Sequence, residues 1–103
     1  MSDDNVIDMT VLTLADFSSH VQHPFPLQAG DRRLTLVLEE AVELRPAQGQ
    51  LPAAFSLIFR GPEAPILAQG TYKFEHPTRG PVDIFIVPVG KDAAGVRYQA
   101  IFS

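Results

Sequence analysis

Three histidines are the first residues of this 103-residue chain whose type and spacing could do chemistry. His20 and His23 stand three positions apart, and His76 lies far along the chain. Two imidazoles at this spacing on a helix can share a metal ion. Pro24, however, directly follows His23 and moves that residue away from helical geometry. No Cys or pair of carboxylates stands beside the two histidines in the sequence. We therefore expect structural histidines, with no metal site and no cofactor.

His76 also belongs to the most suggestive acid–base pair, Glu75-His76. Neighbours in a strand point to opposite faces, so the two side chains are poorly placed to exchange a proton. His76 is in phase with Tyr72, and we expect its imidazole to end a strand and bond to a loop carbonyl. The alternative places Tyr72 and His76, with Arg60 nearby, at the mouth of a barrel. Arg60, Tyr72 and His76 are thus the candidate interaction residues.

The remaining motifs do not assemble catalytic machinery. Residues 90–95 have the glycine spacing of a phosphate loop but lack its Gly-Lys-Ser/Thr ending. A strand is expected from Val96, so no helix N-terminus is available for an anion, and a hairpin turn with Asp92 and Gly95 explains the spacing. The serines lack the G-x-S-x-G context of a nucleophile elbow. The sequence predicts no catalytic residue and a protein that is not an enzyme.

Short strands must position these residues, because nine prolines and seven glycines punctuate the chain. Alternation of apolar and polar residues predicts five or six strands, over residues 25–27, 32–44, 55–59, 70–76, 82–89 and 96–102. Segment 32–44 also fits a helical period, and both interpretations stay open. Arg32 and Arg33 favour the strand, since they would oppose the macrodipole of a helix. Glu40 breaks the alternation there, as a bulge would. Prolines beside Phe25 predict an edge strand.

One short helix is expected before the strands. Thr13 fits an N-cap, and Asp16 takes the reciprocal place in a capping box. Leu14, Phe17 and Val21 form one apolar stripe, which would close an end of the sheet structure. These elements predict an all-β, mainly antiparallel fold: a small five- to six-stranded barrel or sandwich with one short N-terminal helix.

The charge is concentrated at the start of the chain. Twelve acidic and eight basic residues give a net charge of −4, and four aspartates but no Lys or Arg lie in the first sixteen residues. We expect a flexible acidic tail over residues 1–8 and one compact β domain over 9–103, with Met1 and Met9 both open as the true start. The balanced domain disfavours binding to nucleic acid or an anionic membrane. With no secretory signal and no spanning apolar run, we expect a cytoplasmic protein.

Several short motifs follow one another in a recognisable order. They are Leu-Thr-Leu-Ala-Asp-Phe at 12–17, Phe-Arg-Gly-Pro at 59–62, Gln-Gly-Thr-Tyr at 69–72, Glu-His-Pro at 75–77, Ile-Phe-Ile-Val-Pro-Val-Gly at 84–90 and Tyr-Gln-Ala-Ile-Phe at 98–102. This pattern resembles a family of uncharacterised small bacterial all-β domains, and it covers nearly the whole chain from Met9. Members of that family often stand beside genes for phage-tail-collar-like proteins. The resemblance implies an assembly or accessory role and transfers no catalytic residue.

Two classes of function follow. The leading hypothesis is a non-enzymatic protein-interaction or assembly accessory module. Its partner would be a phage-tail-collar-like protein or a second copy, and a homo-oligomer would form through the edge strand near Phe25 and Leu27. The alternative is a small-ligand-binding or catalytic β-barrel with a site near Tyr72 and His76, which needs a cavity of roughly several hundred Å³.

Overall fold

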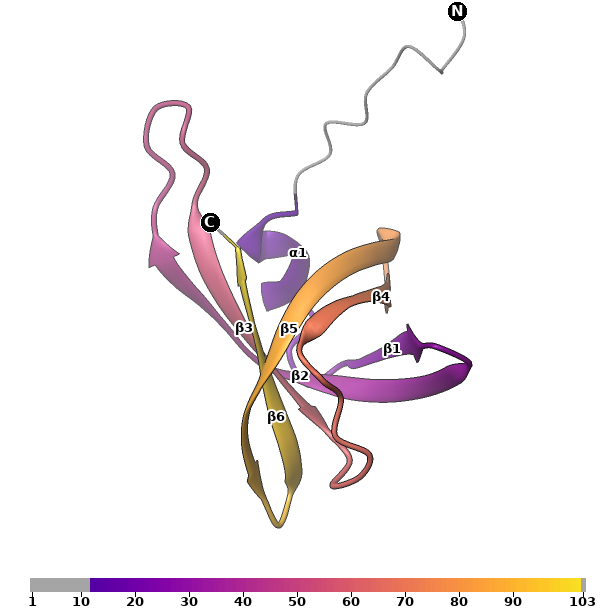
Figure 1. Cartoon of the computed structure of the whole chain (residues 1–103). Coiled ribbons are helices and arrows are strands. Elements are labelled where there is room, and N and C mark those ends of the chain that lie inside the picture. The colour runs from indigo at the N-terminus through magenta and orange to yellow at the C-terminus, as the bar shows by residue number, and fades with distance from the viewer. Residues whose placement is uncertain (1–11, 103) are drawn as a thin grey trace, which may run out of the picture.

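The computed structural model describes residues 12–102, so the acidic tail predicted over residues 1–8 lies outside the described part. The elements are α1 (Leu14–Ser18), β1 (Pro24–Ala29), β2 (Arg32–Arg45), β3 (Ala54–Gly61), β4 (Gly70–His76), β5 (Gly80–Asp92) and β6 (Gly95–Phe102). The strands form a closed antiparallel barrel in the order β1-β2-β3-β6-β5-β4, with β1 returning to β4 (Figure 1). The predicted all-β fold with one short helix is confirmed, and segment 32–44 is a strand.

Two long strands allow the barrel to close, because each serves a different neighbour along each half. β2 pairs with β1 over residues 32–37 and with β3 over 37–45. β5 pairs with β4 over residues 80–86 and with β6 over 87–92. The predicted bulge is confirmed, since the β2–β3 register shifts between Leu38 and Glu40. A bulge bends and twists its strand, which suits the point where β2 changes partners.

The inward side chains of the strands make one apolar core. Its largest fully buried members are Phe17, Phe25, Leu27, Leu36, Leu38, Phe55, Leu57, Phe59, Phe74, Ile84, Ile86 and Tyr98. Phe17 comes from α1, and its ring lies 6.1 Å from Phe25, 6.0 Å from Phe55 and 5.8 Å from Phe102. The helix therefore contributes to the core at the end of the barrel where these strands meet, as its apolar stripe predicted.

The apolar stripe predicted for the helix nevertheless included one residue too many, Val21. α1 ends at Ser18, and Val21 lies in the following turn with an exposed side chain. Gln22 has a φ of 70°, so the chain turns sharply there before it enters β1 at Pro24. A proline at this point disfavours helical geometry in the residue before it. The turn into the barrel thus takes Val21 off the helix face.

The prediction that the strand around Phe25 is an edge is wrong. β1 pairs with β2 along its full length and with β4 at Leu27 and Gln28. The prolines do limit the second pairing, because Pro24 and Pro26 have no N–H and the β4 ladder begins only after them. A homo-oligomer formed through a free β1 edge loses its structural basis at these residues.

Both predicted hairpins of the second half are confirmed by the pairings of β4 with β5 and of β5 with β6. Asp92 Oδ1 accepts the Ala94 N–H at 2.8 Å, and β6 begins directly at Gly95. Gly95 has a φ of +126°, and a Cβ there would lie 2.0 Å from the Gly61 carbonyl oxygen. The β5–β6 hairpin is therefore closed by a tight turn over residues 92–95, whose last position requires glycine. Within residues 12–102, no helix has the length and apolar character needed to cross a membrane.

Candidate functional site

The three candidate residues of the sequence do not form one site. Tyr72 and His76 both belong to β4, four residues apart, which separates them by about 13 Å along a strand. Arg60 lies on β3 between the buried Phe59 and Gly61, on the outer face of the barrel. Each of the three has its own set of partners, and these partners define what each side chain does.

The His76 imidazole is held by backbone groups on both sides. Its Nδ1 accepts the N–H groups of Thr78 and Arg79, each at 3.1 Å. Because Nδ1 accepts two bonds, the proton must sit on Nε2, which donates to the Asp16 carbonyl in α1. The bond predicted to a loop carbonyl is thus made to a helix carbonyl instead. With both nitrogens engaged and the residue 3% exposed, His76 has no atom free to bind a metal or relay a proton.

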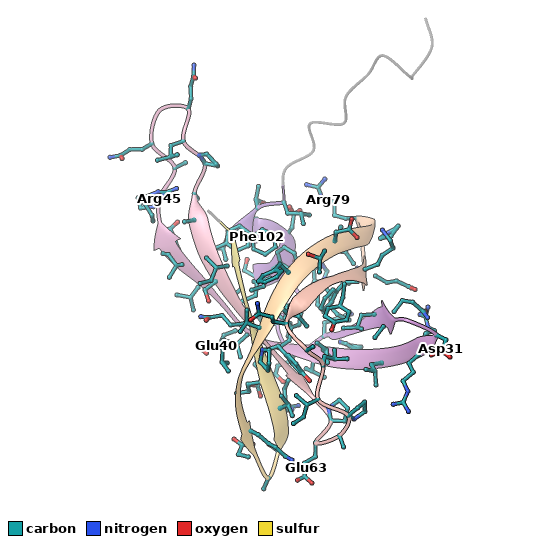
Figure 2. The ribbon with its side chains drawn as sticks, viewed as in Figure 1. Asp31, Glu40, Arg45, Glu63, Arg79 and Phe102 are labelled. Carbon is teal, nitrogen blue, oxygen red and sulfur yellow. The ribbon has the colours of Figure 1, made fainter. Side chains whose placement is uncertain are left out.

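Asp16 adds a second tie between α1 and the β4–β5 turn. Its carboxylate accepts the Thr13 N–H at 2.8 Å, which completes the predicted capping box, and two Arg79 nitrogens at 3.1 Å each. Arg79 lies at the end of the barrel where α1 sits (Figure 2). Burial raises the pKa of Asp16, but the hydrogen bonds from Arg79 and Thr13 outweigh it, so the pKa lies below its ordinary value. The carboxylate is ionised at neutral pH and fastens the helix.

The structure does bring the three histidines together. The His20 ring lies 5.4 Å from that of His23 and 5.2 Å from that of His76, measured between ring centroids. Both ring nitrogens of His76 are already hydrogen-bonded to backbone groups. Among the described residues, no group of three or more His, Asp or Glu side chains is arranged to hold a metal ion. The cluster packs α1 and the following turn against the barrel.

Arg60 belongs to an ion-pair network that sequence reasoning missed. It pairs with Glu39, and Arg97 on β6 donates to the same carboxylate at 3.0 Å and also pairs with Asp92. Arg60 and Arg97 stand directly opposite each other on neighbouring strands, where like charges repel. Glu39 reaches both because the bulge leaves it unpaired on β2. The network balances two cations with two anions, so Arg60 is not a free anion-binding group.

Two residues of this ion-pair network, Asp92 and Arg97, have shifted pKa values. The Ala94 N–H and the Arg97 side chain hold the pKa of Asp92 below its ordinary value. Hydrogen bonds to Asp92 and Glu39 raise the pKa of Arg97. These charges are therefore fixed at neutral pH.

The two tyrosines of the core hold the loop between β3 and β4. Tyr72 donates its hydroxyl proton to the Ala68 carbonyl at 2.6 Å, and the Tyr98 hydroxyl accepts the Leu67 N–H at 2.9 Å. Leu67 is itself buried in the core. The polar end of Tyr72, placed at a barrel mouth by one interpretation of the sequence, is engaged in fastening this loop.

Several exposed apolar side chains lie on the β2–β3 hairpin, which projects beyond the barrel (Figure 1). Val42, Leu44 and Leu51 are each about half exposed. If the alternation of Leu34, Leu36 and Leu38 continued unbroken along β2, Val42 and Leu44 would face inward. Because the bulge inserts one residue, the phase reverses, so that Ala41 pairs with the inward Leu57 and Val42 turns outward. Glu40, the break in the alternation, was the signal from which this reversal could have been predicted.

Residues 12–102 match the model of a family described as a domain of unknown function, DUF6916. The chain belongs to this family. No curated protein and no solved structure matches it. The DUF6916 match spans the whole described barrel, from the residue before the Thr13 cap to the last residue of β6. The structural interactions of His76, Asp16 and Glu39 therefore all lie within the family domain.

Proposed function

We propose that this DUF6916 protein is a non-enzymatic interaction module that docks through the β2–β3 hairpin and the adjoining end of β6. The observation that carries the proposal is the exposure of Val42, Leu44, Leu51 and Ile101, which are 47–59% exposed. We call these four residues the hairpin surface. The strand register places Val42 and Ile101 on either side of Ser56, in one row across three strands. Exposed apolar residues gathered in this way mark interaction sites.

Hydrogen bonds close the end of the hairpin, which favours docking. Gln48 and Leu51 exchange two backbone hydrogen bonds, at 2.9 and 2.8 Å, around the turn that contains Gly49. Arg45 donates to the Pro52 carbonyl at 2.9 Å and ties the two sides together below that turn. A preformed hairpin loses little conformational entropy when a partner covers it.

The charge of this region favours an apolar protein cleft as its partner. Residues 46–53 carry no charged side chain. Within residues 40–59 the charged residues are Glu40, Glu43 and Arg45, and the Arg45 side chain donates to the Pro52 carbonyl. Phosphate groups of nucleic acid or anionic lipid would meet net negative charge here.

The alternative of a ligand-binding or catalytic barrel gains no support from these contacts. Both nitrogens of His76 are bound to backbone groups, and the Tyr72 hydroxyl is bound to Ala68. The barrel interior between them holds the rings of Phe25, Phe59 and Phe74. These side chains fill the space that an internal site would need.

For the partner, we propose a phage-tail-collar-like protein, which would make this module an assembly accessory, with a second copy as the other candidate. Burying a half-exposed Leu gives about 1 kcal/mol, so the pair Leu44 and Leu51 supplies about 2 kcal/mol. The double variant Leu44→Ser/Leu51→Ser should therefore weaken binding about 30-fold by titration calorimetry. The matched control is Ile66→Ser/Val89→Ser, whose side chains are equally exposed elsewhere and should change affinity less than about threefold.

Size-exclusion chromatography with light scattering, on the chain alone, measures whether two copies of the chain bind each other. A dimer that the Leu44→Ser/Leu51→Ser variant dissociates supports docking of one copy on another. A wild-type chain that stays monomeric and shows no affinity for the collar-like partner would overturn the proposal, and so would equal weakening by both double variants.

A further inference from the structure

The outer face of the barrel has a side where exposed charges are matched and a side that carries the hairpin surface. Around β4, Lys73 Nζ lies 3.0 Å from Asp83 Oδ1, and Arg33 Nη2 lies 2.8 Å from Glu75 Oε2. The hairpin surface lies on the other side, where β2, β3 and β6 adjoin. A partner that covers it meets the polar groups of that second side, and these groups set the chemistry the partner needs.

A row of outward side chains borders the hairpin surface and begins with a carboxylate. The strand register sets Glu40 opposite Ile58, and Ile58 opposite Gln99. Glu40 stands two residues before Val42 on β2, and Gln99 stands two residues before Ile101 on β6. Side chains two residues apart in a strand share a face. A partner that covers Val42 and Ile101 therefore covers Glu40 as well.

Glu40 carries a charge that the barrel does not balance. Its side chain is exposed, and no ion pair in the part of the chain that the structure describes includes it. The cations of the next row, Arg60 and Arg97, pair with Glu39 and Asp92, and this network is neutral as a whole. Burying a carboxylate without a counter-charge is strongly unfavourable. The partner must therefore bring a cation to Glu40.

Gln99 supplies a second acceptor in the same row. Its Nε2 donates to Ser56 Oγ at 3.2 Å, which leaves its Oε1 as an acceptor. Neighbouring strands lie about 4.8 Å apart, so the backbones of Glu40 and Gln99 are about 10 Å apart, with Ile58 between them. An ammonium or guanidinium group only donates hydrogen bonds, which suits two flanking acceptors. The methylene stem of Lys or Arg would pack on the apolar Ile58.

A second copy of the chain is a poor occupant of this surface. In a symmetric dimer the same patch meets itself, so two Glu40 carboxylates would enter the interface. The cation of the same hairpin, Arg45, already donates to the Pro52 carbonyl at 2.9 Å. Like charges brought together in an interface suppress association. The surface therefore favours a different protein, one that carries a basic side chain.

We propose that the partner docked on the hairpin surface presents a Lys or Arg side chain over Ile58, where Glu40 pairs with the cation and Gln99 accepts a further hydrogen bond. This inference rests on the proposed docking function and deepens it, because it specifies the partner as an apolar protein surface with a basic group. Leu44 and Leu51 then supply affinity through apolar contact, whereas Glu40 selects the partner by charge.

Titration calorimetry of the full chain with the collar-like protein, at about 50 and about 500 mM NaCl, tests the proposal. Glu40→Gln should weaken binding about 10-fold at the lower salt concentration, because a charge-assisted hydrogen bond is lost. The affinity of this variant should also depend less on salt than that of wild type. The matched control is Glu63→Gln, an exposed carboxylate at the end of the barrel away from Arg45 (Figure 2), which should change affinity less than about twofold.

The leucine variant separates this inference from the docking function. If Leu44→Ser/Leu51→Ser weakened binding while Glu40→Gln bound like wild type at both salt concentrations, docking would stand and the basic group of the partner would be refuted. A wild-type dimer in light scattering that the leucine variant dissociates would also overturn the inference, because a second copy would then occupy the surface. A wild-type monomer that dimerises on Glu40→Gln replacement supports it. No affinity of wild type for the collar-like protein would overturn this inference together with that partner.

Discussion

Replacing His76 with Phe removes the hydrogen bonds that join α1, the end of β4 and the β4–β5 turn while it preserves a ring in the core. The bonds lost are those from the Thr78 and Arg79 N–H groups and the one to the Asp16 carbonyl. A net hydrogen bond contributes about 1 kcal/mol, and unpaired buried partners cost somewhat more. Because Thr78 and Arg79 are exposed, water can bond to the N–H groups that lose the imidazole, which limits the cost at these two positions. We therefore expect a loss of about 2–3 kcal/mol in the free energy of unfolding.

Urea denaturation at pH 7, followed by circular dichroism, measures this loss as a shift of the midpoint. With a slope of about 1.5 kcal/mol/M, the midpoint should fall by between 1 and 2 M, all being approximate values for a small domain. His76→Ala should lose about 4–5 kcal/mol, because it also leaves a cavity beside the Phe17 and Phe25 rings, whose centroids lie 5.2 and 5.7 Å away.

His23→Phe is the matched control, because His23 is exposed and should change stability by less than about 0.5 kcal/mol. If His76→Phe lost less than about 1 kcal/mol, or no more than His23→Phe, the backbone bonds to the imidazole would not be what fastens α1.

Two further variants address the turn and the helix tie. Gly95→Ala should lower the unfolding midpoint temperature by more than about 12 °C in calorimetry, since its Cβ would lie 2.0 Å from the Gly61 oxygen. Gly90→Ala should not lower the midpoint temperature in this way, because the space around Gly90 is open. Equal losses of midpoint temperature in the two variants would refute the steric explanation. Asp16→Asn should be less stable than wild type at pH 7 by about 1 kcal/mol. Because folding lowers the pKa of Asp16 below 3.8, its stabilisation is present above that pH and lost as pH falls through the folded value. The difference should narrow in acid denaturation series, and a constant difference down to about pH 2 would contradict this assignment.

Local features of the sequence determined much of the fold. The alternation of residues 70–76 and 96–102 predicted strands because one face of each had to be apolar. Thr13 and Asp16 predicted the start of the helix, since their side chains satisfy backbone groups only a few residues away. The Gly and Pro clusters predicted the hairpins for the same reason: turn chemistry depends on neighbouring residues.

The candidate site was predicted less well, because its partners come from distant parts of the chain. Sequence placed His76 at a strand end, but only the fold brings Asp16, sixty residues away, to its Nε2. Glu39 lies between Arg60 and Arg97 only because the bulge and the β3–β6 register bring three strands together.

By itself, then, the sequence determined that this chain builds antiparallel strands around an apolar core, with one capped helix and tight turns at defined glycines. The tertiary structure decided that β1 is paired on both sides and that the polar candidates serve the fold. It also turned Val42 outward and, within residues 12–102, left β5 paired with β4 alone over residues 80–86. Periodicity records which side chains share a face, whereas barrel closure and a one-residue bulge determine which face meets the solvent.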